Sequence, residues 1–200
     1  GESVAAIDLG EVHPAAATDG EEAVVFSARQ MRALAQLTNK RLAEIQAKQA
    51  RKSKGSRSWK RLQRRKNRFL AQQRRRRQDI EHKVSRSVVN WAVTRQVGTL
   101  AVGDVRDVAD QVDTGQVNNQ KISNWTHGRM RRYLTYKAEA EGIQVVLVNE
   151  AYTTQECPNC HGRHKPRGRV YRCPVCGFVS HRDAVGSANI LSCFLFGELG

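Results

Sequence analysis

Four cysteines near the carboxyl end of the chain form two Cys-x-x-Cys pairs. Cys157 and Cys160 make the first pair, and Cys173 and Cys176 make the second after twelve intervening residues. Each pair predicts a turn on which two thiolates converge, and four thiolates close a tetrahedral site of soft ligands that favours zinc. Such a set leaves no open coordination position. We therefore predict one structural Zn²⁺, with an iron–sulfur site or redox-active thiols as alternatives.

Histidines and basic residues surround these cysteines. His161, His164 and His181 could compete as ligands, but a histidine beside four cysteines is more typical of a surface residue. Cys193 lies in a later apolar segment and is expected to be a small core residue. The segment between the two pairs is basic, which favours contact with nucleic acid. Its cations are Arg163, Lys165, Arg167, Arg169 and Arg172.

Two aspartates stand at the borders of apolar segments that are far apart in the sequence. Asp8 lies in the strand-like segment 4–9, and Asp183 lies in "HRDAVGSANIL" at the start of an apolar helix. Either residue alone is typical of a cap or a turn. Together, and with a third acid, they could hold two divalent ions about 3.5–4 Å apart, as hydrolysis of a phosphodiester requires.

The positive charge of the chain is concentrated in one segment. Residues 29–95 contain 22 of the 34 lysines and arginines and only three of the 19 acids. A solvated helical face normally alternates positive and negative side chains, so this excess of positive charge favours binding to a phosphate backbone. No apolar run reaches 18 residues and no signal peptide is evident, which predicts a cytoplasmic protein without a membrane span. Metal-binding thiols also suit a reducing compartment.

Hydrophobic periodicity predicts an α/β fold with a mixed sheet. Three strands of an antiparallel meander come first, followed by two long helices that are separated by the break 52–58. A strand, a helix and a further strand then alternate, which is typical of crossover connections. The expected strands are 4–9, 13–18, 23–27, 99–105 and 143–148, and the expected helices begin near 28, 59 and 125 and end near 50, 97 and 141.

Several motifs, in order along nearly the whole chain, resemble one known family. They are "AAIDLG", "KGSRSWKRLQRRKNRFLAQQRRRRQDIEHKVS", "YTTQECPNCHG", "YRCPVCG" and "HRDAVGSANIL". This combination is similar to the carboxy-terminal nuclease half of the TnpB transposon-associated RNA-guided DNA endonucleases, which are related to the small type V CRISPR effectors. The resemblance implies an RNase H-like (RuvC) domain over 1–152 and 178–200, with a basic helical segment at 28–97 and a zinc ribbon inserted at 153–177.

The resemblance also implies a catalytic triad of acids, one of which is missing from its usual position. The first acid falls on Asp8 and the last on Asp183, with His181 where the family motif has another aspartate. The middle glutamate normally closes the fourth strand, where this chain has Gly103. Glu150 closes the neighbouring strand and could reach over Gly103, an arrangement that some branches of the family show. The alternatives are a solvated Glu150 and an inactive site.

Neighbouring acids are weaker candidates for the missing glutamate. Strand alternation sends Asp104 to the opposite face from position 103, and Asp107 lies beyond the strand end. The resemblance therefore implies catalysis with two Mg²⁺ held by Asp8, Glu150 and Asp183. A catalytically inactive RNA-guided DNA-binding protein and a DNA transposase stay open as alternative functions.

The resemblance further implies guide RNA and target DNA as partners, and a prokaryotic cytoplasmic protein that is associated with the nucleoid when bound to DNA. The family's amino-terminal guide-binding region is expected to be missing from this chain. Sequence choice would rest on guide pairing, and basic side chains would contact phosphates. The expected nucleic-acid-binding residues are Lys54, Arg57, Lys60, Arg61, Arg64, Arg65, Lys66, Arg68, Arg74, Arg75, Arg76 and Arg77.

Overall fold

The computed structural model describes residues 3–10, 12–104, 127–149 and 153–197. These residues divide into two compact units. The first unit comprises residues 1–27 together with 84–200, and the second comprises residues 28–83. Among the predicted site residues, Glu150 lies outside the described residues, as does Asp107.

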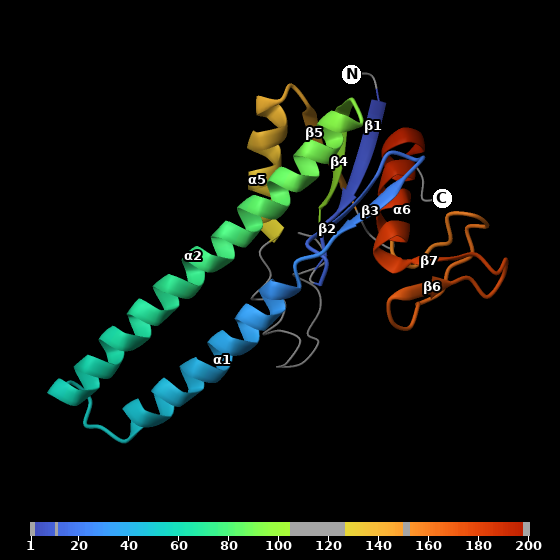
Figure 1. Ribbon diagram of the computed structural model, residues 1–200. Helices are drawn as coiled ribbons and strands as arrows, with labels where there is room; N and C mark the ends of the chain where they lie inside the picture. Colours follow the sequence, from blue (N-terminus) through green and yellow to red (C-terminus); the bar gives the residue numbers. More distant parts are fainter. Residues whose placement is uncertain (1–2, 11, 105–126, 150–152, 198–200) are drawn as a thin grey trace. The chain divides into compact units, whose positions relative to one another are not determined.

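A five-stranded mixed sheet forms the centre of the first unit, in the order β3-β2-β1-β4-β5 (Figure 1). Its strands are β1 (Ser3–Asp8), β2 (Ala15–Thr18), β3 (Ala23–Phe26), β4 (Val97–Asp104) and β5 (Gln144–Asn149). β1, β2 and β3 form the antiparallel meander that the sequence predicts, whereas β4 pairs parallel with both β1 and β5. The expected mixed sheet is confirmed, and its two parallel pairs place the ends of β1, β4 and β5 at one edge.

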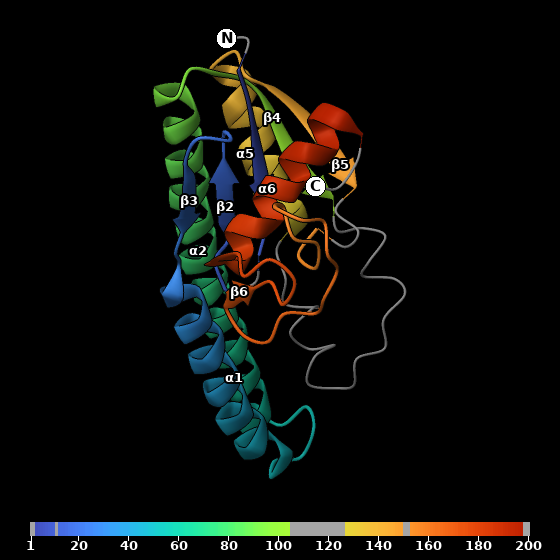
Figure 2. The same ribbon diagram turned by 90° about the vertical axis from the view of Figure 1, so that its right-hand side faces the viewer.

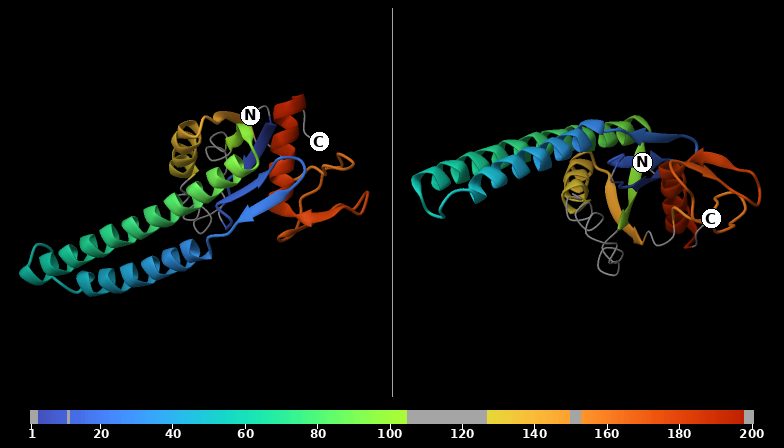
Figure 3. Two further views of the ribbon diagram at one scale, coloured as in Figure 1. Left: turned by 45° about the horizontal axis from the view of Figure 1, so that its top comes forward. Right: turned by 90° about the horizontal axis from the view of Figure 1, so that it is seen from below.

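Helices cover both faces of this sheet (Figure 2; Figure 3, right). α6 (Arg182–Phe196) crosses one face, where its apolar side packs Ile190 and Leu191 against Ala6 of β1 and Ala101 of β4. α5 (His127–Ala140) covers the other face beside the last residues of α2 (Arg57–Thr94). Since both faces are covered, β1 and β4 are almost entirely apolar, as the sequence shows.

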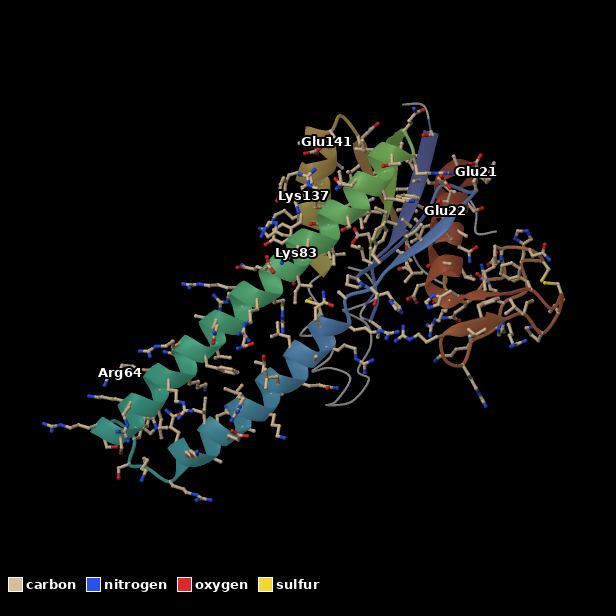
Figure 4. The ribbon with its side chains drawn as sticks, viewed as in Figure 1. Glu21, Glu22, Arg64, Lys83, Lys137 and Glu141 are labelled. Carbon is tan, nitrogen blue, oxygen red and sulfur yellow. The ribbon has the colours of Figure 1, made fainter. Side chains whose placement is uncertain are left out.

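Polar contacts join α5 to the part of α2 that belongs to the first unit. Lys137 donates a hydrogen bond to Ser85 Oγ at 2.7 Å, and Arg86 pairs with Glu141 at 2.8 Å. Figure 4 shows Lys137 and Glu141 on the α5 side that approaches α2. Burial lowers the pKa of Lys137, and the charge of Arg86 lowers it further. These contacts fix α5 against the carboxyl-terminal turns of α2.

The second unit is a pair of antiparallel helices, α1 (Arg29–Ala50) and the portion of α2 up to residue 83 (Figure 1). The expected break lies between them, and Ser56 Oγ accepts a hydrogen bond from the amide of Trp59 at the start of α2. Gln49 donates to Gln63 at 2.8 Å and thereby joins the two helices. Most of the remaining surface of this unit is polar and positively charged.

The predicted bounds of two elements need correction. The second long helix ends at Thr94 rather than near residue 97, because Gln96 adopts φ 55° and turns the chain directly into β4. The second strand begins at Ala15 rather than at His13, since Pro14 has no amide proton to donate to a strand ladder. His13 therefore lies in the connection between β1 and β2.

No helix in the described part of the chain is both long and apolar enough to cross a membrane.

Candidate metal centres and nucleic-acid interface

Asp8 and Asp183 both lie where the end of β1 meets the first turns of α6 in the first unit. Asp8 is the last residue of β1, and Asp183 is in the first turn of α6, the helix that crosses β1. The pKa of Asp8 is raised from 3.8 to about 7, first by burial and then by the negative charge of Asp183, while Arg182 partly opposes the shift. A buried carboxyl group and a second carboxyl group beside it are a favourable pair of ligands for a divalent cation.

Gly186 provides the space for the Asp8 carboxylate. A Cβ atom at position 186 would lie 2.3 Å from Asp8 Oδ2 and 3.3 Å from the methyl group of Thr154. No side chain could therefore occupy position 186 without moving the carboxylate. Gly186 is one turn after Asp183 on α6. The same helix therefore carries the Asp183 carboxylate and leaves space for the Asp8 carboxylate.

Gly103 occupies the position on β4 that the register places beside Asp8. The last residue pair of the β1–β4 ladder is Ile7 with Val102, and the next residues of the two strands are Asp8 and Gly103. Gly103 is buried and pairs with Val148 on β5. The middle acid is thus absent from β4 at the point where its side chain would meet Asp8.

Asp104 points away from this site, as strand alternation predicts. Its Oδ1 accepts a hydrogen bond from Arg131 at 2.9 Å, and Arg131 belongs to α5 on the opposite face of the sheet from α6. Asp104 therefore forms an ion pair on the α5 face of the sheet, away from Asp8.

The four cysteines converge as their spacing predicts. Their sulfur atoms all lie within 4.8 Å of one another, with Cys157 Sγ 3.6 Å from Cys176 Sγ and Cys160 Sγ 3.5 Å from Cys173 Sγ. Four sulfurs about 2.3 Å from a central zinc would be separated by about 3.8 Å in a regular tetrahedron. The cluster therefore has the dimensions of a tetrahedral thiolate site.

The two Cys-x-x-Cys turns have the same backbone structure. The amide of Cys157 donates to the carbonyl of Gly162 and the amide of Cys173 to that of Phe178, each five residues ahead. The fifth residue of each turn has a positive φ, 58° at His161 and 75° at Gly177. In the second turn, hydrogen bonds from the Asn159 side chain and the Phe178 amide lower the pKa of the Cys176 thiol to about 6. That shift favours the thiolate that a metal requires.

The cysteine turns are packed onto α6. Tyr171 of β6 (Val170–Arg172) is fully buried in a core that contains Cys157, Cys173 and Val185 of α6. β6 pairs antiparallel with β7 (Val179–His181), and the second cysteine turn connects the two strands. β7 ends at His181, which is the residue directly before α6. The ribbon and the Asp183 turn are therefore directly connected.

Asn189 ties the chain that enters the ribbon to the same helix. Its fully buried side chain donates to the carbonyl oxygens of Thr153 at 2.6 Å and Glu156 at 2.9 Å. Glu156, also buried, accepts from Arg163 at 2.7 Å. No sequence pattern marks this role of Asn189, because an asparagine in an amphipathic helix resembles any other polar position.

His13 is a further residue near the acids that the sequence analysis missed. Together with His181 and Asp183 it forms a cluster whose possible ligand atoms all lie within 4.8 Å of one another. The rings of His13 and His181 meet edge to face with centroids 5.2 Å apart. His13 is 168 residues from His181 in the sequence, so only the fold brings the two imidazoles together.

The second unit presents cations without compensating acids. Ten of the twelve predicted nucleic-acid-binding residues are exposed, while Lys66 and Arg77 are half-buried. Within residues 29–83, all of them described, none of these twelve side chains has an acid within 4 Å, whereas Arg41 and Lys83 pair with Glu44 and Asp79. Arg64, for example, extends outward from α2 (Figure 4). This surface is suited to phosphates.

The sheet order, the acids on β1 and α6, and the inserted cysteine cluster define an RNase H-like fold of the RuvC type. Comparison with protein families identifies the relatives. The OrfB_IS605 family, described as probable transposase, matches residues 1–109, and the Cas12f1-like TNB domain matches residues 127–190. The chain therefore belongs to the TnpB/OrfB_IS605 family, which confirms the resemblance seen in its motifs.

Individual relatives have related names. The chain is 31% identical over 169 residues to the putative RNA-guided DNA endonuclease InsQ of Escherichia coli K12, covering 78% of this chain and 42% of InsQ. It is 26% identical over 117 residues to the CRISPR-associated endodeoxyribonuclease Cas12f1 of Sulfoacidibacillus thermotolerans, covering 57% of this chain and 26% of that protein. The TnpB-like protein MJ0751 of Methanocaldococcus jannaschii is 27% identical over 124 residues, which is 61% of this chain and 44% of MJ0751. The chain thus spans less than half the length of these relatives.

Solved structures confirm the fold. A Cas12f ternary complex matches with a TM-score of 0.76 over 94% of this chain and 38% of its own, at 14% identity. A Cas12f1–sgRNA–target DNA complex matches with a TM-score of 0.68 over 94% of this chain and 49% of its own, at 15% identity.

Proposed function

We propose that this chain is the nuclease part of an RNA-guided DNA endonuclease, and that Asp8, Glu150 and Asp183 hold two Mg²⁺. The observation that carries this proposal is the packing of the Asp8 carboxylate against Gly186, one turn after Asp183 on α6, where the charge of Asp183 also raises the pKa of Asp8. The names of InsQ and Cas12f1 support the reaction class. Bound in this way, two Mg²⁺ supply Lewis acidity at the phosphodiester and activate water for in-line attack.

The described residues on both sides of Glu150 support its role as the third ligand. Before it, Asn149 pairs with Asp104 of β4, and Val148 packs against the cluster beneath α6. After it, Thr153 is held by Asn189, and the Thr154 methyl group lies beside Gly186 and hence near Asp8. Residue 150 has the same parity as Val148, and a strand alternates its faces at every residue, so the α6 side is the expected one for Glu150.

Two carboxylates and one cation of the protein have different roles at this site. Asp8 lies at the end of a rigid central strand and Asp183 in the first turn of a packed helix, so both carboxylates are fixed before a cation binds. Arg169 Nη1 lies 3.8 Å from Asp183 Oδ2, and this cation from the ribbon would move toward the phosphate of a bound strand once Asp183 is shared with a metal.

We assign one structural Zn²⁺ to Cys157, Cys160, Cys173 and Cys176. The sulfur spacing and the matched backbone turns support this assignment, and a complete thiolate set gives the ion no catalytic position. Its function is to fold the ribbon, which carries Arg169 and packs on α6 through Tyr171 and Val185.

The partners proposed are a guide RNA and its target DNA. The uncompensated cations of α1 and α2 provide phosphate contacts, and guide pairing provides the sequence choice. Solved relatives are described as complexes with sgRNA and target DNA. We assign 1–152 and 178–200 to the nuclease domain and 153–177 to the ribbon, and place the protein in the prokaryotic cytoplasm, at the nucleoid when bound to DNA. The guide-reading region is assigned to a segment outside this chain.

Gly103 favours a second candidate, an inactive RNA-guided DNA-binding protein of the same fold. Loss of the usual middle acid would remove cleavage and leave binding intact. A DNA transposase is a third candidate, since a site of three acids also suits strand transfer.

The natural protein that contains this chain, purified with its bound RNA, tests these alternatives. Sequencing that RNA defines the guide and therefore a supercoiled plasmid target. We expect Mg²⁺-dependent linearisation by the wild-type complex and none by Asp8→Asn, with equal plasmid retention by both. Retention without cleavage by the wild type would support the inactive binder, and joining of DNA ends would support the transposase.

A further inference from the structure

Two imidazoles and a carboxylate meet beside the proposed Mg²⁺ site. His13 comes from the connection between β1 and β2, His181 is the residue before α6, and Asp183 is in the first turn of α6. Their possible ligand atoms all lie within 4.8 Å of one another, and all three residues are half-buried. Two segments that are distant in the chain thus bring metal-binding groups to one point.

The local structure holds both histidines in place. A Cβ at Gly10 would lie 2.7 Å from the carbonyl oxygen of His13, so the connection after β1 is tight. His181 Nδ1 accepts a hydrogen bond of 3.3 Å from the Asp183 amide and therefore caps α6. This hydrogen bond fixes the His181 ring beside Asp183, and a cation bound through Nδ1 would take the place of the amide proton.

The donor set has a different metal preference from the acids. Mg²⁺ selects oxygen ligands, whereas imidazole suits first-row divalent ions such as Fe²⁺, Ni²⁺, Cu²⁺ and Zn²⁺, and Mn²⁺ accepts both kinds of ligand. Two imidazoles with one carboxylate leave coordination positions open, unlike the four cysteines. Nearby charges are mixed: Asp8 adds a negative charge near Asp183, while Arg169 and Arg182 add positive ones.

We propose that His13, His181 and Asp183 form a nitrogen-containing site for one first-row divalent cation, separate from the cysteine cluster and sharing Asp183 with the proposed Mg²⁺ site. The inference rests on the positions of these three side chains and does not require DNA cleavage. If the proposed nuclease function also holds, this site gives the catalytic centre a preference for imidazole-binding ions over Mg²⁺.

Mn²⁺ is the probe of choice, because its coupling to a nitrogen ligand can be detected. The cysteine cluster is kept loaded with zinc during the titration. Electron spin-echo spectroscopy detects coupling between Mn²⁺ and ¹⁴N of a ligating imidazole, which oxygen ligands do not give. With excess Mg²⁺ present to occupy oxygen-only sites, we expect the chain to bind Mn²⁺ with ¹⁴N coupling.

Matched variants assign the coupling to the two histidines. His13→Phe keeps an aromatic ring against residue 181, and His181→Asn keeps a helix cap. Each is expected to reduce the ¹⁴N modulation and weaken Mn²⁺ binding by about tenfold or more, and the double variant should lose the modulation. His82→Ala, at an exposed position of α2, serves as the control and should change neither. Zinc content and thermal unfolding verify that each variant is folded.

The outcomes separate this site from the proposed nuclease function. Mn²⁺ bound without ¹⁴N coupling in the wild type, or coupling that persists in the double variant, would overturn the site. Failure of the purified protein to cleave DNA while the ¹⁴N coupling depends on both histidines would overturn the nuclease function and leave this site standing.

Discussion

The carboxylate of Asp8 lies where a side chain at position 186 would begin. Asp8 Oδ2 is 2.3 Å from the position of a Cβ on Gly186, so the end of β1 and the first turns of α6 are fitted to each other at this point. The fit places Asp8 against the helix that carries Asp183. It also makes the position of Asp8 dependent on the absence of a single methyl group.

Gly186→Ala is therefore expected to damage the proposed catalytic site without unfolding the sheet. The added methyl group must displace the Asp8 carboxylate or the Thr154 side chain, and a metal ligand that is misplaced by about 1 Å can cost about 100-fold in rate. DNA cleavage by the reconstituted complex measures the loss. Gly128→Ala is the control, because no atom of the residues that the structure describes lies within 4 Å of a Cβ there. Equal cleavage by both variants would contradict the importance of the fit.

Removing the Asp8 charge should stabilise the cation-free protein. The pKa of Asp8 is raised from 3.8 to about 7, so the folded state binds more protons than the unfolded state between these values. The free energy of unfolding should then fall as pH rises from about 4 to 7. Asp8→Asn should lose this part of the pH dependence and be the more stable protein at pH 8. Urea unfolding of zinc-loaded protein at pH 5 and pH 8, without added divalent cations, measures it. An unchanged pH dependence would show that Asp8 ionises normally.

Cys173→Ser is expected to abolish stoichiometric zinc binding and loosen the ribbon. Cys173 is buried in the same core as Tyr171 and Val185, so loss of the ion should expose that core. Zinc content by atomic absorption and proteolysis within residues 153–181 measure the two effects. Cys193→Ser is the matched control, because Cys193 lies on α6 outside the cluster and should leave the zinc content at one per chain. Equal zinc content in both variants would refute the assignment.

Neutralising four adjacent arginines of α2 should weaken RNA binding in a salt-dependent way. Replacing Arg74, Arg75, Arg76 and Arg77 by glutamine should reduce the slope of log affinity against log salt by about 0.7–0.9 for each phosphate contact that is lost. Arg41→Gln with Lys83→Gln is the control, since acids already compensate these two cations. Filter binding over a range of salt concentrations measures the slopes. A slope that does not change in the fourfold variant would place the phosphate contacts elsewhere.

The sequence predicts what local patterns encode. Apolar alternation and helical periodicity identify the strands and helices, and the cysteine spacing predicts the cluster with all four of its members. The alternation rule also correctly sends Asp104 away from Asp8, to Arg131. Each of these features depends on residues within one element or on a short repeated motif.

The features that the sequence did not predict depend on the approach of distant elements. His13 reaches His181 only because α6 crosses the end of β1, and Gly186 matters only because Asp8 lies against it. Asn189 similarly acquires its role from the chain that passes beside α6. No periodicity marks such positions, since their partners are more than 30 residues away.

The most direct measurement of the central claim is cleavage of the guide-matched plasmid by Glu150→Gln and Asp104→Asn complexes. Both substitutions replace an acid near the gap at Gly103 by its amide. We predict that Glu150→Gln loses more than about 100-fold in rate, because even indirect partners of metal ligands are worth about 10–100-fold. Asp104→Asn should stay within about threefold of wild type, since Asp104 pairs with Arg131 on the other face. Full cleavage by Glu150→Gln would contradict the relocation of the third acid.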